Sequence, residues 1–178
     1  MNSYSSKIVF GFFLLAASVV MVPKPARAVT SSSVLYTLQI PKLKVVAPVI
    51  SVGLTSDGRM DVPNNYKQIG LLNNAPRPGE KGSAVLAAHV DNGGKIAGVF
   101  KQIKTLRIGD DIYTTDTAGK VLHFKVVAMK VYDKNSTNTE NVFNMKDRSR
   151  LNLVTCFGLY LPKENTYDRR LVVFTELV

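Results

Sequence analysis

The sequence contains a single cysteine, Cys156, and only two histidines, His89 and His123. One thiol excludes an internal disulfide, so in an exported protein this cysteine is either a buried bystander or a reactive nucleophile. Internal repeats and low-complexity tracts are also missing, as is the ladder of aromatic and basic residues with which proteins bind single-stranded nucleic acid. The free thiol is therefore the feature that most needs explaining.

Acidic residues are few: 13 Asp and Glu stand against 23 Lys and Arg, and the net charge is +10. A positive charge of this size attracts polyanions. For an exported protein, we expect the anionic cell wall or membrane face as the partner rather than nucleic acid. A basic surface that merely keeps the protein soluble is the simpler alternative.

The one long apolar run lies near the N-terminus. Lys7 precedes residues 8–22, a stretch at the short end of the roughly 20 residues that a membrane helix needs. The Ala-Arg-Ala at 26–28 has the small-x-small pattern of a signal-peptidase site. Residues 1–28 are therefore predicted to be a cleaved signal peptide or a retained membrane anchor, and both alternatives stay open. Either one places the remaining chain outside the cytoplasm, at the membrane face or in the cell wall.

The rest of the chain has the pattern of a mainly β domain. Short β-branched runs alternate with Gly, Pro, Asn and Asp. A linker at residues 29–34 leads into one domain at residues 35–178, which is long enough to bury a core. Strands are predicted at residues 35–40, 43–52, 83–89, 111–115, 121–131, 150–156 and 170–177.

Other segments carry weaker predictions. Pro48 marks the second strand as an edge or bulged strand. One helical turn is expected within residues 64–72, and a short helix at 99–106, where apolar residues recur at helical spacing. Residues 157–168 are expected to form a loop.

Two of the predicted strands end in residues that can carry chemistry. His89 follows Ala-Val-Leu-Ala-Ala, and Cys156 follows Leu-Asn-Leu-Val-Thr. If these strands run side by side in the same direction, both side chains reach one rim of the sheet. An imidazole there can act as a base or stabilise the thiolate, which is the reactive form of cysteine. Arg170 begins the last strand, and its permanently charged guanidinium can stabilise an oxyanion. His123 lies mid-strand and is expected to be structural.

This constellation resembles the sortases, the cysteine transpeptidases of Gram-positive cell surfaces. The resemblance covers about residues 35–178. The matching segments are Leu-Gln-Ile-Pro-Lys-Leu (38–43), the histidine strand with the loop before it (76–91), residues 100–110, Leu-Val-Thr-Cys (153–156) and Arg-Leu-Val-Val (170–173). The Val-Asp pair after the histidine is most similar to sortases of classes E and F. The family often has glycine before this histidine, where this chain has Ala88.

The resemblance implies a closed β-barrel of about eight strands with short helices, and catalytic roles for His89, Cys156 and Arg170. Arg169 and Arg170 point to opposite faces of a strand, so only one can serve. Arg170 is preferred because it directly precedes Leu-Val-Val, as in the family pattern. Residues expected to line the substrate pocket are Thr155, Val85, Ala87, Val154 and Phe157.

The implied reaction is a transpeptidation. Cys156 would attack the carbonyl between Thr and Gly of an LPXTG-like sorting signal at the C-terminus of a surface protein. An amine from a peptidoglycan cross-bridge or its precursor would then resolve the thioacyl-enzyme. The resemblance implies no metal and no organic cofactor, and the carboxylate set with which some sortases bind calcium is not evident.

Two other functions remain open on the sequence. L,D-transpeptidases also place His before Cys in a β fold, but their Ser-x-Gly-Cys signature is missing, since Cys156 follows Leu-Val-Thr. The other alternative is a non-catalytic module that binds the cell wall through its basic surface.

Overall fold

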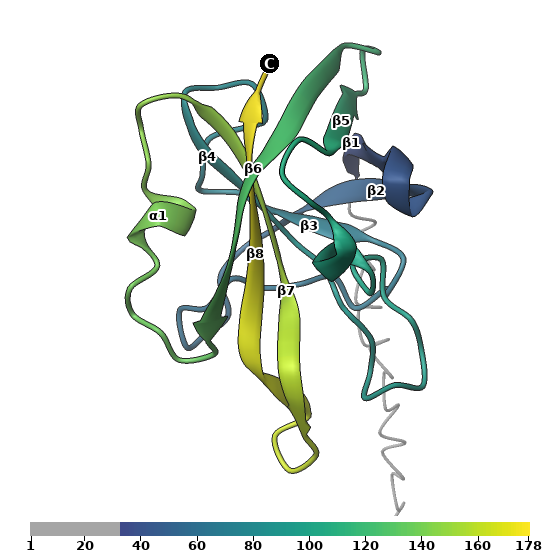
Figure 1. The fold of residues 1–178 in the computed structure, drawn as a ribbon, viewed down its shortest axis with the longest axis vertical. Coiled ribbons are helices and arrows are strands. Elements are labelled where there is room, and N and C mark those ends of the chain that lie inside the picture. Colours follow the sequence, from purple (N-terminus) through teal and green to yellow (C-terminus); the bar gives the residue numbers. More distant parts are fainter. Residues whose placement is uncertain (1–32) are drawn as a thin grey trace, which may run out of the picture. The chain divides into compact units, whose positions relative to one another are not determined.

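The computed structural model describes residues 33–178, and eight strands in this part of the chain close into a barrel (Figure 1). Around the barrel the order is β1-β2-β3-β4-β7-β8-β6-β5. The strands are β1 (Val34–Ile40), β2 (Val45–Val52), β3 (Ile69–Leu72), β4 (Gly82–Ala87), β5 (Asp111–Asp116), β6 (Val121–Asp133), β7 (Ser149–Leu161) and β8 (Thr166–Leu177).

Helices are few and short. They are η1 (Pro41–Leu43), η2 (Ile103–Thr105) and α1 (Glu140–Phe143). The predicted mainly β barrel with short helices is thus confirmed. Among the described residues, none of the helices has the length and apolarity to cross a membrane. The signal or anchor predicted at residues 1–28, and the linker up to residue 32, lie outside the described residues.

The strand β4 is the centre of the fold. All six of its residues are buried: β3 and β7 pair with its two edges, and packed side chains cover both of its faces. The cover on both faces explains why residues 84–87 of β4 are a continuous apolar run rather than an alternating one. Its two faces serve different clusters: Leu86 packs into the main core, whereas Val85 packs into a smaller cluster that includes Val142 of α1.

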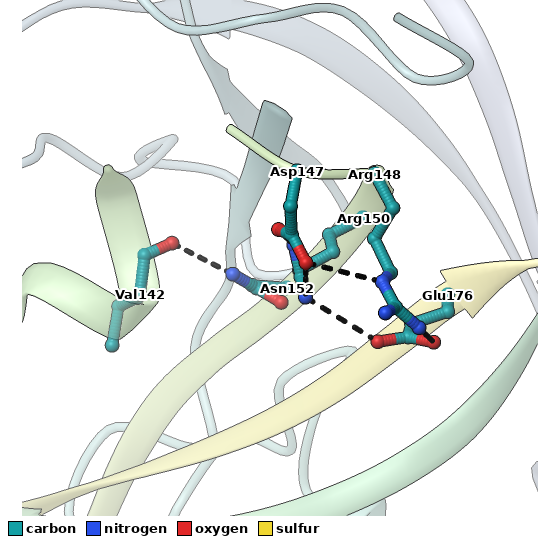
Figure 2. A network of polar contacts seen from close by, with 6 residues as sticks. All are labelled: Val142, Asp147, Arg148, Arg150, Asn152 and Glu176. Carbon is teal, nitrogen blue, oxygen red and sulfur yellow. Dashed lines mark hydrogen bonds and ion pairs between the residues drawn. The ribbon is translucent and has the colours of Figure 1, made fainter. Parts of the chain in front are cut away.

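Polar contacts fix the surroundings of β7 (Figure 2). The side chain of Asn152, buried in β7, donates from Nδ2 to the carbonyl of Val142 over 2.7 Å and so holds α1 against the sheet. A second network joins the start of β7 to the end of β8. In it, Arg148 and Arg150 both contact Asp147 and Glu176.

The structure corrects several predicted elements. The expected helical turn within residues 64–72 is a turn followed by β3, and the helix expected at 99–106 is only the short η2. β2 is not an edge strand, since it pairs with both β1 and β3. Pro48 is tolerated inside it because the pairing with β3 begins only at Val49, so the missing N–H breaks no ladder on that side.

The largest correction concerns the loop expected at residues 157–168. β7 and β8 continue through most of this segment as a two-stranded ribbon, drawn at the bottom of Figure 1. A register shift between Phe157 and Tyr160 interrupts the ribbon. Gly158 lies there with a φ of +91°, and an added Cβ would meet the Asp168 carboxylate at 2.1 Å. The glycine therefore marks a bulge within the ribbon and not a loop.

Candidate active site

A cavity of about 690 Å³ opens where β4 ends beside β7 and β8. Its lining includes His89, Cys156 and Arg170, the three residues that the sequence singled out as catalytic. Each comes from a different segment of the chain. The structure therefore brings together, around one cavity, groups that are up to 81 positions apart in the sequence.

Backbone register explains this convergence. β4 and β7 are parallel, which is the condition for both side chains to reach one rim of the sheet, and Ala87 pairs with Val154. The amide of Ala88 extends the ladder by donating to the carbonyl of Val154 over 3.2 Å. His89 lies two residues after Ala87, and Cys156 lies two residues after Val154, so the parallel register places His89 beside Cys156. The prediction that Cys156 ends its strand is wrong. Cys156 lies inside β7, and it is β4 that ends beside it.

Cys156 and Arg170 face the cavity together. They are direct partners in the antiparallel pairing of β7 with β8, so their side chains emerge on one face of the sheet. Arg169 instead pairs with Phe157, is exposed, and contacts the carboxylate of Asp168 at 3.7 Å. Arg170 lines the cavity and Arg169 does not.

The imidazole of His89 is held from two sides. Its Nε2 lies 2.9 Å from the carbonyl oxygen of Pro63, and its ring stacks on Tyr66 with 4.2 Å between ring centroids. A carbonyl oxygen only accepts hydrogen bonds, so Nε2 carries a hydrogen. In the neutral ring Nδ1 is then the nitrogen with a free lone pair, and Nδ1 is the position that can take up a proton.

The loop after His89 folds back tightly over it. Phe100 donates its amide to the His89 carbonyl over 3.1 Å, and the backbone of Gly98 passes so close that an added Cβ would lie 2.1 Å from that oxygen. Only glycine fits this approach. The backbone around His89 is therefore fixed from its C-terminal side as well.

Arg170 is oriented by its own strand. Nη1 donates to the carbonyls of Tyr167 and Arg169, each over 2.9 Å, and Nη2 donates to Oγ1 of Thr166 over 3.1 Å. A guanidinium offers five N–H donors, so two remain after these three hydrogen bonds. Such an anchored cation beside a thiol can stabilise negative charge that develops on a carbonyl oxygen.

The expected pocket residues divide into two groups. Ala87, Val154 and Thr155 line the cavity, although the hydroxyl of Thr155 is buried and donates to the carbonyl of Ala88 over 2.8 Å. Val85 and Phe157 do not line it. Val85 is fully buried in the cluster beneath α1, and Phe157 points to the opposite face of β7, against the main core.

The family model of the sortase domain matches residues 38–178 of this chain. The chain belongs to the sortase family. Sortases are cysteine transpeptidases of the cell surface, and this is the activity class that membership assigns. Among curated proteins, a sequence search finds no match.

Solved sortase structures share the fold of this sortase. A lid mutant of sortase A from Corynebacterium diphtheriae superposes with a TM-score of 0.65 at 21% identity, over 83% of this chain and 71% of that one. The Clostridium perfringens sortase C solved with the C-terminal cell wall sorting motif gives 0.64 at 26% identity, over 83% and 71%. A sortase D5 from the same organism gives 0.61 at 23% identity, over 82% and 79%.

Several cavity residues of this sortase were not predicted from the sequence. Asp91 accepts hydrogen bonds at Oδ1 from the hydroxyl of Tyr167 and from the amide of Gly93, the latter over 3.0 Å. Burial, and then the hydrogen bond to Asp91, raise the pKa of Tyr167 to about 12, so its hydroxyl stays a donor at neutral pH. The position of Asp91, two residues after His89, could have marked it as a cavity residue. Tyr66 and Tyr167 had no such signal, because nothing local marks a residue whose partner is distant in the sequence.

The other histidine lies outside the cavity. His123, expected to be structural, stacks on Tyr113 and places Nε2 at 2.7 Å from Oδ1 of Asp111. Between residues 33 and 178, no group of three or more His, Cys, Asp or Glu side chains is arranged to hold a metal ion.

Proposed function

We propose that this sortase cleaves an LPXTG-like sorting signal between Thr and Gly and transfers the protein to an amine of the cell wall, with Cys156 as nucleophile, His89 as acid and base, and Arg170 as oxyanion or substrate-backbone ligand. One observation carries this proposal: the β4–β7–β8 register gathers these three side chains around one cavity. Ala87, Val154 and Thr155, which line the same cavity, contact the bound peptide.

The first half-reaction acylates the enzyme. The Cys156 sulfur, as thiolate, attacks the threonine carbonyl, and negative charge moves to its oxygen, where the free N–H donors of Arg170 stabilise it. His89 gives its Nδ1 proton to the departing glycine nitrogen as the C–N bond breaks. A thioester on Cys156 and a free amine on the released peptide remain.

The second half-reaction runs in reverse order with a new amine. The acceptor nitrogen attacks the thioester carbonyl, the C–S bond breaks, and His89 takes the proton that the nitrogen loses. The product is an amide that joins the surface protein to a peptidoglycan cross-bridge or its precursor. No step calls for a metal or an organic cofactor.

Within the family we propose class E or F, because Val90 and Asp91 directly follow His89. The place of action is the extracytoplasmic face of the membrane if residues 1–28 are retained, or the cell wall if they are removed.

The test is a search for the acyl-enzyme. The domain is incubated with a library of sorting-signal peptides, and intact-mass spectrometry identifies an adduct on Cys156. A peptide-specific adduct that an added amine discharges supports the proposal. Cys156→Ala should form no adduct and should keep its fold, because the change removes little volume. Full activity of Cys156→Ala, or a thiol inert to every peptide, would refute it.

A further inference from the structure

A carboxylate and two aromatic rings form a corner of the cavity beside the proposed catalytic residues. We name it the Asp91 corner; it consists of Asp91, Tyr160 and Tyr167, all of which line the cavity. Asp91 comes from the loop after His89, whereas the tyrosines are direct partners across the β7–β8 ribbon. The proposed reaction of the first substrate uses none of the three.

The corner is held in place from several directions. Oδ1 of Asp91 accepts from the Tyr167 hydroxyl and the Gly93 amide. The Tyr160 hydroxyl donates to Oδ1 of Asn165 over 2.7 Å. The Tyr160 ring lies so close to Gly93 that an added Cβ there would meet it at 2.9 Å. Fixed groups bind a ligand without first losing conformational freedom.

The Asp91 corner still has groups that are free to bind a ligand. Within residues 33–178, Oδ2 of Asp91 takes part in no hydrogen bond or ion pair, so one carboxylate oxygen is left to accept from a ligand. The rings of Tyr160 and Tyr167 stand 5.2 Å apart and are tilted by 59°. A free carboxylate oxygen next to tyrosine faces suits a primary ammonium group, which gains a charge-assisted hydrogen bond and a cation–π contact.

We infer that the Asp91 corner binds the ammonium group of the acceptor, the second substrate. This inference rests on the proposed function, since only an acyl-transfer enzyme needs such a site. Asp91 lies two residues beyond His89, so an ammonium held there stands close to the group that must take its proton. The protein as a whole is strongly basic, with a net charge of +10. Its general field repels a cation, and a local carboxylate offsets that repulsion.

The proton balance assigns each group a step. The bound ammonium releases one proton to solvent and becomes an amine. The amine nitrogen forms a bond to the thioester carbon, its second proton passes to Nδ1 of His89, and the C–S bond breaks to return the Cys156 thiolate. Asp91 accepts no proton in this sequence, and it acts by raising the local concentration of the acceptor.

The test measures how the thioacyl-enzyme divides between water and an added nucleophile. Cadaverine carries ammonium groups at pH 7.5, whereas hydroxylamine is neutral there. In Asp91→Asn, we expect the cadaverine concentration needed for half-maximal transfer to rise about tenfold, the lower end of the effect of losing a charged hydrogen bond. Transfer to hydroxylamine and the rate of Cys156 acylation should both change less than about twofold.

Matched variants separate this role from a structural one. Asp111→Asn removes the same charge from a carboxylate outside the cavity and should leave the partition unchanged. Tyr160→Leu removes one aromatic face from the partly exposed ribbon. It should also weaken transfer to cadaverine and spare hydroxylamine, which keeps the test decisive if Asp91→Asn does not fold.

The outcomes are distinct. Normal acylation with an unchanged cadaverine partition in Asp91→Asn overturns the acceptor site alone. An equal loss for cadaverine and hydroxylamine also overturns it, because the corner would then only support the fold of the site. A wild-type protein that forms no Cys156 adduct with any peptide instead refutes the proposed function on which the site rests.

Discussion

At the scale of single residues, strand register decides which of two identical side chains reaches the cavity. Arg169 and Arg170 are neighbours with the same chemistry, but they pair with Phe157 and Cys156 respectively. Alternation along β8 therefore puts only Arg170 on the cavity face. The same alternation on β7 separates Val154, which lines the cavity, from Phe157, which packs against the core.

This difference predicts unequal effects of two matched substitutions. Arg170→Ala should lower kcat/KM for sorting-peptide cleavage by about 10² to 10³, the range seen when one oxyanion donor is lost. Arg169→Ala should stay within about twofold, as expected for an exposed side chain. Steady-state kinetics on both variants is the measurement. A larger loss in Arg169→Ala would show that the wrong arginine has been assigned.

Tyr66 offers a test of how His89 is positioned. Its ring stacks on the imidazole, so Tyr66→Ala removes one of two supports and should cost about tenfold to a hundredfold in kcat, the effect of a small misplacement of a reacting group. Tyr66→Phe keeps the stacking ring and should retain nearly full activity. The pH–rate profile should change in Tyr66→Ala and not in Tyr66→Phe. Equal profiles in all three proteins would argue against a positioning role.

The chain order of chemistry-bearing residues predicted that His89, Cys156 and Arg170 meet at one cavity, which the structure shows, but it did not predict the residues that support them. His89, Cys156 and Arg170 stand beside strong local patterns: an apolar strand, a Thr-Cys pair and an Arg-Leu-Val-Val run. Tyr66 and Pro63, which hold His89, lie 23 and 26 positions before it with no local mark. Contacts across such distances depend on barrel closure, which no window of sequence displays.

At the scale of elements, burial on two sides made some strands easy to predict and exposure made others hard. Residues 84–87 of β4 are all apolar because the strand is covered on both faces, and the position of β4 was predicted closely. The ribbon formed by β7 and β8 beyond Cys156 is partly exposed and contains Gly158, so its sequence has the composition of a loop. Backbone pairing, which composition does not report, makes it a ribbon.

The short helix α1 depends on one buried side chain, which gives the next prediction. Asn152→Ala removes the hydrogen bond to Val142 and leaves a buried carbonyl without a partner, at a cost of about 1–3 kcal/mol. Because Val142 and Phe143 line the cavity, activity should fall as well. Asn141→Ala, an exposed change on the same helix, should alter stability by less than about 0.5 kcal/mol. Urea unfolding of both variants tests this; equal midpoints would contradict the anchoring role.

At the scale of the whole molecule, the barrel joins segments that are distant in the chain, and charged groups contribute to that closure. Asp147 and Glu176 form hydrogen bonds and ion pairs with Arg148 and Arg150. These contacts lie where β7 begins and β8 ends, at the opposite end of the two strands from the ribbon. Hydrogen bonds from Arg150, and also from Arg148, hold the pKa of Asp147 well below its usual value of 3.8. The carboxylate is solvent-exposed, so the associated stabilisation is modest.

Because the pKa of Asp147 is lowered in the folded protein, the stability of the molecule depends on pH in a definite direction. A carboxyl whose pKa is lower in the folded state stabilises the fold above its unfolded pKa, near 3.8, and loses this contribution as the pH falls further. Asp147→Asn should therefore have a slightly lower urea midpoint than the wild type at pH 7 and pH 5, with the difference shrinking below about pH 4. In an Arg150→Gln background the same substitution should have a much smaller effect, because the principal partner is gone. A midpoint difference that widened as the pH fell would contradict the ion pair as its source, since protonation can only remove a contribution that requires the charged carboxylate.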